Sequence, residues 1–414
     1  APACVIALDL VAPDAPAYPI LVDPLWTGTS IMTEPRVTVA VALGATGRVL
    51  LPGGRNDAGY LATVDVYDEA TNSFAVVESL PQARVGFGLA FVEATGTALV
   101  TGGCAGTADD CAVTAGSLAF DPSSGTWQGV GSLAAPRASH RSYRISGGRV
   151  LVVGGIDSLE PGIEAFAATE LFDPAAGAFS PGPPLPSGRY LFGGAEMDDG
   201  SVVIAGGRRY VAGAELVAVD RYDAGVDAWA ALPDLPSARR EPVVAALADG
   251  RTLVAGGTYQ VTPLGSSMVL EPDLGWTSTG ALAAGREGPA SVRLDNGWVV
   301  IAAGADTAAA DALRVGPTAV ASEWLSLEPL DAPRMRPAQA KLPSGNWLVA
   351  GGWGGYENDA LDTALVLTVS PAGAPCGAGA TCASGYCADG VCCDTPCDGA
   401  CVACAVAAGA ALDG

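Results

Sequence analysis

The chain has 414 residues, of which 50% are hydrophobic and 16% are charged, a composition that excludes an intrinsically disordered protein. Its formal net charge of −23 at pH 7 argues against nucleic acid as a partner, because phosphate recognition needs a basic surface. The 55 glycines and 30 prolines suit many short strands joined by tight turns.

Three features of the sequence bear on where the protein is located. No apolar run approaches the roughly 18 residues of a membrane-spanning helix, so no membrane span is predicted. The chain begins with Ala1 rather than Met, which fits a cleaved signal peptide or a trimmed fragment. Eight of the 11 cysteines lie between Cys376 and Cys404, a density that is typical of an oxidising compartment. We therefore expect a secreted, extracellular or cell-surface protein.

Three residue types recur along the chain at fixed offsets. A glycine pair closes each apolar run, at intervals of 47 to 52 residues. An arginine stands 18 or 19 residues before the second member of each pair, and an aromatic residue stands ten residues before each arginine. The pairs are Gly53-Gly54, Gly102-Gly103, Gly154-Gly155, Gly206-Gly207, Gly256-Gly257, the degenerate Ala303-Gly304, and Gly351-Gly352. The arginines are Arg36, Arg84, Arg137, Arg189, Arg239, Arg286 and Arg334, and the aromatics are Trp26, Phe74, Trp127, Phe179, Trp229, Trp276 and Trp324.

Each repeat is interpreted as four short strands. An apolar run such as 37–43 follows the arginine, and a second run such as 150–153 ends at the glycine pair. A third strand ends near Tyr67-Asp68 in the first unit, and the fourth begins at the aromatic residue. Strands of this length with regular turns predict antiparallel sheets that must pack on their neighbours, because a single sheet cannot bury both faces.

The pattern resembles the kelch repeat: an arginine, an apolar strand, a double glycine, Tyr-Asp-Pro and then Trp. The resemblance covers residues 18–371 and implies an all-β, seven-bladed kelch-type β-propeller. The seventh unit lacks its own aromatic residue and Trp26 is spare, so we expect an N-terminal strand to close the last blade. The expected domains are an N-terminal extension (1–17), the propeller (18–371) and a disulfide-rich module (372–414).

The loops after the glycine pairs vary most in length and lie on the same face as the start of each first strand. Variable loops on a rigid scaffold are typical of binding surfaces. The predicted ligand-binding residues there are Arg55, Tyr60, Arg208, Arg209, Tyr210, Tyr259, Trp353 and Tyr356. The alternative is that the aromatic residues cover apolar contacts of their own loops. Cys104 and Cys111 are predicted to form a disulfide that stiffens one of these loops.

The seven repeat arginines are predicted to lie at the channel mouth. Two interpretations of them remain open. They could hold an acidic ligand, as arginines near this position sometimes do in kelch propellers. Alternatively, each could pair with backbone carbonyls or with a neighbouring carboxylate.

Enzymatic kelch propellers of the galactose oxidase type need two histidines and tyrosines on copper, one tyrosine being crosslinked to cysteine. This chain has one histidine, His140, so the resemblance implies a propeller without that copper site. No zinc, Ser-His-Asp or nucleotide motif is evident. We therefore predict no catalytic residues, metal or cofactor, and a protein that is not an enzyme. A carboxylate-based carbohydrate enzyme remains the residual alternative.

Cysteines dominate the chain after Pro375, where almost no apolar residues could form a core. The predicted disulfide cysteines are Cys376, Cys382, Cys387, Cys392, Cys393, Cys397, Cys401 and Cys404. Their pairing stays open, Cys4 has no obvious partner, and zinc is the rival interpretation. The run from Cys382 to Cys393 resembles Cys-rich modules of secreted and surface proteins of myxobacteria.

Two functional hypotheses follow for the whole chain. The first is an extracellular or cell-surface binding or adhesion protein whose loop face recognises a protein or glycan. The second is a structural subunit that assembles with its own copies into a surface appendage or extracellular filament.

Overall fold

The computed structural model describes residues 25–107, 111–158, 160–271, 274–355 and 359–370, and the backbone of 381–382, 386–388 and 391–393. Every regular element within these residues is a β-strand. The prediction of an all-β fold is confirmed. Residues Trp26–Thr368 form one compact unit, and Val369 onward belongs to a second unit.

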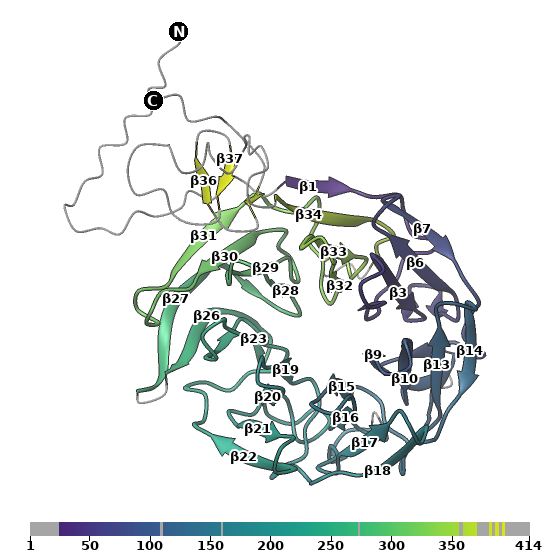
Figure 1. Cartoon of the computed structure of the whole chain (residues 1–414). Coiled ribbons are helices and arrows are strands. Elements are labelled where there is room, and N and C mark those ends of the chain that lie inside the picture. The colour runs from purple at the N-terminus through teal and green to yellow at the C-terminus, as the bar shows by residue number, and fades with distance from the viewer. Residues whose placement is uncertain are drawn as a thin grey trace, which may run out of the picture. The chain divides into compact units, whose positions relative to one another are not determined.

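The larger sheets of the first unit each consist of antiparallel strands that follow one another along the chain. Figure 1 shows the first strand of each sheet near the centre of a ring and the last strand at its rim. The first three sheets are β2–β3–β6–β7 (Val41–Ala42, Arg48–Pro52, Val64–Asp68, Ser73–Val76), β9–β10–β13–β14 (Gly88–Val92, Thr97–Thr101, Ser117–Asp121, Thr126–Gly129) and β15–β16–β17–β18 (Arg141–Arg144, Val150–Val153, Glu170–Asp173, Ala178–Pro181).

The remaining larger sheets repeat this order. They are β19–β20–β21–β22 (Gly193–Glu196, Val202–Ala205, Val219–Asp223, Ala228–Leu232), β23–β24–β26–β27 (Val243–Ala246, Thr252–Ala255, Thr262–Glu271, Gly275–Arg286), β28–β29–β30–β31 (Ala290–Arg293, Val299–Ala302, Ala310–Arg314, Glu323–Leu327) and β32–β33–β34 (Ala338–Lys341, Trp347–Ala350, Ala364–Ser370). Short strands lie in the loops after the glycines: β4 (Arg55–Asn56), β5 (Gly59–Tyr60), β11 (Cys104–Gly106), β12 (Cys111–Val113) and β25 (Thr258–Tyr259), while β8 (Arg84–Val85) pairs with β11.

The N-terminal strand β1 (Leu25–Gly28) lies beside β34, more than 330 residues away in sequence, and forms the outer edge of that sheet (Figure 1). The amide of Thr29 donates to the carbonyl of Ala364 at 3.1 Å, and the amide of Met32 donates to that of Asp362 at 2.8 Å. The indole Nε1 of Trp26 donates to the Glu328 carbonyl at 3.0 Å.

The core lies between neighbouring sheets. The centre of each second strand is apolar, as in Val150–Val153, because this strand is buried on both faces. Val49 and Leu51 pack with Leu348 and Val366 in one buried cluster that joins the first and last sheets along the chain.

The aromatic residue of the fourth strand links each sheet to the one before it. The Nε1 of Trp127 donates to the carbonyl of Glu78 at 2.9 Å, and that of Trp229 donates to the carbonyl of Pro183 at 3.1 Å. In four sheets the ring also packs against an aromatic residue of its own third strand; the centroids of Phe120 and Trp127 are 5.0 Å apart. These rings therefore fill space within and between sheets.

The glycine pairs have a backbone reason. Gly154 has a φ of 66°, in the left-handed region that favours glycine. A Cβ on Gly154 would lie 2.2 Å from the carbonyl oxygen of Arg189, so no side chain fits there. Ala303 takes the same place with a φ of 60° and is the one non-glycine member of the described pairs.

Gly154→Ala is expected to lower the free energy of unfolding by about 1 to 2 kcal/mol through backbone strain, and by about 1 to 3 kcal/mol more through the clash with Arg189. Gly148→Ala is the matched control, since its φ is 75° and no atom lies within 4 Å of the added Cβ. Urea unfolding of both variants measures the difference. Equal losses would contradict the steric explanation.

Beyond Ser370 the structure describes three short strands, β35 (Thr381–Cys382), β36 (Tyr386–Ala388) and β37 (Val391–Cys393). The predicted cysteine pairing of this segment, and Cys4, lie outside the described side chains. In the described part of the chain, no helix is long and apolar enough to cross a membrane.

Candidate functional site: the axial cavity and its loop face

A cavity of about 940 Å³ lies along the first strands of the sheets, and we call it the axial cavity. Its lining combines first-strand residues such as Ser142 and Val244 with loop residues such as Arg55 and Ser158. The cavity therefore reaches the loops that follow the glycine pairs. Its volume lies in the upper range of small-molecule sites.

The chain turns sharply two residues after most of the repeat arginines. Ser139, Leu191, Glu241 and Arg336 have φ values of 50° to 56° there, which is unusual for residues other than glycine. The amide of Ser139 donates to the carbonyl of Gly86 at 2.7 Å, which joins neighbouring sheets. Equivalent 2.7 Å bonds run from Glu241 to Leu191 and from Arg336 to Gly288. These turns bring polar backbone and side chains to the cavity wall.

The repeat arginines are buried rather than placed at the channel mouth. Each is at most 6% exposed, and none lines the axial cavity. The Nη1 of every repeat arginine donates to a backbone carbonyl in or just before the third strand of its own sheet, such as that of Thr63 for Arg36. Their guanidinium groups are therefore committed to the backbone and unavailable to an acidic ligand.

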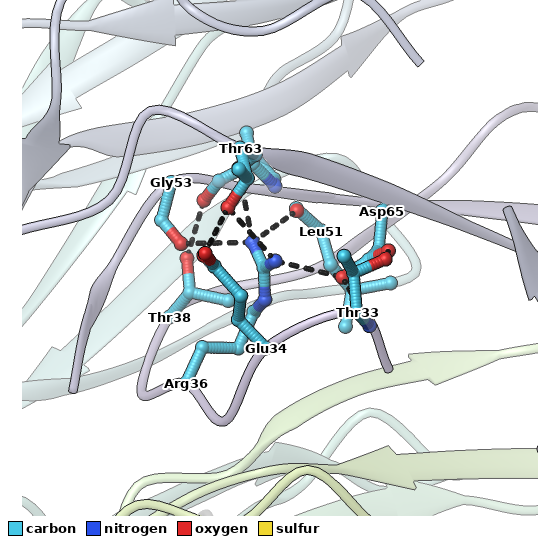
Figure 2. Close-up of polar contacts among 9 residues, drawn as sticks. Thr33, Glu34, Arg36, Thr38, Leu51, Gly53, Thr63 and Asp65 are labelled. Carbon is cyan, nitrogen blue, oxygen red and sulfur yellow. Dashed lines mark hydrogen bonds and ion pairs between the residues drawn. The ribbon is translucent and has the colours of Figure 1, made fainter. Parts of the chain in front are cut away.

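Figure 2 shows this arrangement around Arg36. Its Nη1 lies 3.1 Å from the Gly53 carbonyl oxygen, and its Nη2 lies 2.7 Å from Oδ2 of Asp65. The hydroxyl of Thr33 donates to the other Asp65 oxygen at 2.7 Å. The pKa of Arg36 lies below its usual value because burial lowers it more than the charges of Asp65 and Glu34 raise it.

The carboxylate partner varies between sheets. Arg137, Arg189 and Arg286 pair with Glu170, Asp220 and Asp311 respectively, and Arg334 pairs with Asp331. Arg239 contacts hydroxyls of Ser237 and Ser266 instead, and burial lowers its pKa to about 10. Arg84 donates to the carbonyls of Gly102 and Gly116 and forms no ion pair within the described residues.

Three of the predicted ligand-binding residues line the axial cavity: Arg55, Tyr60 and Trp353. Arg55 and Tyr60 are directly opposite one another in the β4–β5 hairpin. Arg55 is exposed, and its Cζ lies 4.9 Å from the ring centroid of Trp353. Trp353 itself is only 5% exposed and packs with Val37 and Ala360. Trp353, predicted to contact a ligand on the loop face, instead has a buried ring that supports Arg55 from beneath.

The other predicted loop residues lie outside the cavity lining. Arg209 pairs with Glu164 and stacks on Tyr210, with 5.3 Å from its Cζ to the ring centroid. Tyr210 and Tyr259 are 40% and 45% exposed. Arg208 forms an ion pair with Glu215, in which Nη2 lies 2.6 Å from Oε1. Tyr356 lies outside the described residues.

The Cys104–Cys111 disulfide is present, as predicted. It joins β11 and β12 across a short loop. Both cysteines line the axial cavity beside Val113.

His140 is a buried hydrogen-bond acceptor. The amide of Gly88 donates to its Nε2 at 3.1 Å, and Thr101 Oγ1 lies 2.9 Å from the same atom. Burial and the charge of Arg137 lower its pKa to about 3, so the ring is neutral at pH 7 with its proton on Nδ1. Within the described residues, no group of three or more His, Cys, Asp or Glu side chains is placed to hold a metal ion. The described side chains therefore offer no set of ligands that fits a bound copper ion.

Sequence reasoning missed Arg141 and Tyr143 of β15, which both line the cavity. Arg141 occupies the position four residues after the repeat arginine, where the other repeats carry only Ala, Gly or Val (Ala40, Gly88, Gly193, Val243, Ala290 and Ala338). That contrast within the repeat was the signal available in the sequence.

This architecture is a β-propeller-like all-β fold. No protein-family model and no curated protein matches the chain. A solved structure described as that of YjhT is similar, with a TM-score of 0.57 and 15% identity over 72% of this chain and 99% of that one. A fungal alcohol oxidase of the AA5 family, in complex with copper, is similar with a TM-score of 0.61 and 17% identity, over 83% of this chain and 76% of that one.

These comparisons correct one prediction. The expectation that the chain is not an enzyme is contradicted by the alcohol oxidase, because an enzyme shares this fold. At 17% identity the likeness concerns the fold alone.

Proposed function

We propose that this chain is a secreted binding protein, built as a seven-bladed kelch-type propeller over residues 18–371 with a disulfide-rich module over 372–414. The ligand is a protein or glycan recognised by the loop face around the axial cavity. The Cys104–Cys111 disulfide supports an oxidising compartment. The seven larger sheets of the described residues, and the place of β1 beside β34, support the blade number and the closure.

The observation that carries the proposal is the cavity of about 940 Å³ beside Arg55 and Tyr60. Arg55 is exposed and stacks on the buried Trp353, so its guanidinium is presented by a rigid platform. A stacked arginine loses little side-chain freedom when a ligand binds. Tyr60, opposite it in the hairpin, adds an apolar ring with a polar tip.

A second group of exposed side chains extends the same loop face. Tyr210 is 40% exposed under the guanidinium of Arg209, and Tyr259 is 45% exposed. Exposed tyrosines on short loops suit protein contacts and stacking on sugar rings. They provide the outer part of the proposed surface.

The double variant Arg55→Ala/Tyr60→Ala is expected to lose at least about tenfold in affinity, because truncation of two central contacts typically removes more than about 1.4 kcal/mol of binding energy. The measurement is binding of the oxidised wild-type and variant proteins to a glycan array and to surface-protein extracts. Arg221→Ala is the control, since Arg221 pairs with Asp199 outside the cavity.

Unchanged binding by Arg55→Ala/Tyr60→Ala would contradict the loop-face proposal. Absence of any ligand together with self-association in light scattering would also contradict it, and would favour the structural-subunit hypothesis.

A further inference from the structure

Basic residues are concentrated in the axial cavity of an otherwise acidic chain. Among the residues that the structure describes, five Lys and Arg side chains line the cavity, whereas two Asp and Glu side chains do. The basic residues are Arg55, Arg141, Arg293, Arg336 and Lys341, and the acidic ones are Glu196 and Glu241. A cationic wall inside a chain of net charge −23 favours an anionic occupant.

Three of the five cations are already neutralised. Lys341 pairs with Asp295, Arg293 with Asp198, and Arg336 with Glu241. Arg55 and Arg141 form no ion pair with a carboxylate in the described part of the chain. Arg141 is exposed although it begins an innermost strand, so its exposed surface faces the cavity that it lines.

Tyr143 follows Arg141 by two residues and carries a hydroxyl that has no hydrogen-bond partner among the described residues. It is two residues further along β15, so the two side chains point to the same side of the strand. Tyr143 is 7% exposed, and its Oη forms no hydrogen bond with the described residues. A Cβ on Gly194 would lie 2.1 Å from that buried Oη, so the missing side chain at Gly194, itself a lining residue of the cavity, makes room for the hydroxyl.

The nearby carboxylate of Glu196 does not pair with Arg141 or Tyr143. Glu196 lines the same part of the cavity, but the amide and guanidinium of Arg144 donate to both of its oxygens, at 2.6 Å and 3.0 to 3.1 Å. A buried donor without an acceptor is costly, and an anion would satisfy it. Arg141 and Tyr143 thus offer one unpaired cation and one unpaired donor from the same side of β15.

We propose that the axial cavity binds the carboxylate of an acidic saccharide through the Arg141 guanidinium and the Tyr143 hydroxyl. This inference rests on the proposed binding function and names its ligand class. The cavity is walled by strands, so a slender chain end enters more readily than a folded protein surface. The other hydroxyl-bearing lining residues suit the many hydroxyls of a sugar: Thr38, Tyr60, Ser139, Ser142, Ser158 and Ser291.

The test is calorimetric titration of the oxidised full chain with a galacturonic acid trimer, a neutral galactose trimer and a glutamic acid tripeptide. We expect the acidic trimer to bind, and its affinity to fall with added salt. Arg141→Gln and Tyr143→Phe should each weaken that binding about tenfold or more, because each removes a hydrogen bond to a charged group. Arg221→Gln, with the same loss of charge outside the cavity, should bind as the wild type does.

Tyr143→Phe separates binding from folding. Its hydroxyl has no partner within the described residues, so the variant should unfold at the same or a higher temperature than the wild type. Unchanged affinity in Arg141→Gln, absence of acidic-trimer binding, or a preference for the neutral trimer or the peptide would overturn the inference. Binding of the neutral trimer that is lost in Arg55→Ala/Tyr60→Ala would overturn it while leaving the proposed function intact.

Discussion

Replacing Arg36 by Met is expected to lower the free energy of unfolding by about 3 to 5 kcal/mol, because Asp65 is then left as a buried carboxylate without its cation. Both side chains are 0% exposed, so water cannot replace the lost partner. Carbonyls such as that of Gly53 lose a donor as well. Urea unfolding monitored by tryptophan fluorescence measures the loss.

Arg84→Met is the matched comparison within the same repeat pattern. Arg84 has no carboxylate partner among the described residues, and Leu118 stands where the first sheet carries Asp65. Arg84→Met therefore leaves no buried charge behind and should cost well under half as much. The double variant Arg36→Met/Asp65→Leu should also cost less than Arg36→Met alone. A loss in Arg84→Met equal to that in Arg36→Met would contradict this account of the buried pairs.

The protein should lose stability below about pH 6.5 through His140. In the unfolded chain this imidazole has an ordinary pKa near 6.5, whereas burial and Arg137 lower its pKa to about 3 in the folded state. Below pH 6.5 the unfolded chain binds a proton that the folded chain does not. Stability that is fully present above pH 6.5 is then lost at about 1.4 kcal/mol per pH unit as the pH falls toward 3.

The measurement is urea unfolding of the wild type and of His140→Gln at pH 7.0, 5.5 and 4.5. Both proteins share the same carboxylate titrations. The difference between their free energies of unfolding, as a function of pH, therefore reports the contribution of His140 alone. We expect the free energy of unfolding to fall about 2 to 3 kcal/mol further in the wild type than in the variant between pH 7.0 and 4.5. Because His140 is the sole histidine, its NMR titration is unambiguous, and a folded-state pKa near 6.5 would contradict the prediction.

The sequence allowed the main sheets to be predicted because their determinants are local and repeated. The glycine pairs have positive φ values at each described repeat, such as 66° and 94° at Gly154 and Gly155, so their spacing marked the end of each second strand. The aromatic residues marked each outer strand for a similar reason, as the Nε1 bond from Trp229 to Pro183 illustrates. A short sequence separation likewise made the Cys104–Cys111 disulfide predictable.

Side-chain environment was harder to predict, because a repeat fixes a residue's place along the strand but not what packs on it. Trp353 follows a glycine pair, as Arg55 does, yet its ring is buried beneath that arginine. Glu241 adopts a left-handed turn although its residue type does not predict one. The only indication in the sequence is that two other repeats carry a glycine at the equivalent position, Gly86 and Gly288. Tyr143 depends on Gly194 of a different sheet, a contact that only the fold reveals.

The measurement that tests the central claim most directly is side-by-side binding of the wild type and Arg55→Ala/Tyr60→Ala to one array of neutral glycans, acidic glycans and surface proteins. The account predicts a defined set of ligands for the wild type, at least about tenfold weaker binding by the double variant, and unchanged binding by Arg221→Ala. Equal binding by the wild type and the double variant would contradict the loop face around the axial cavity as the recognition surface.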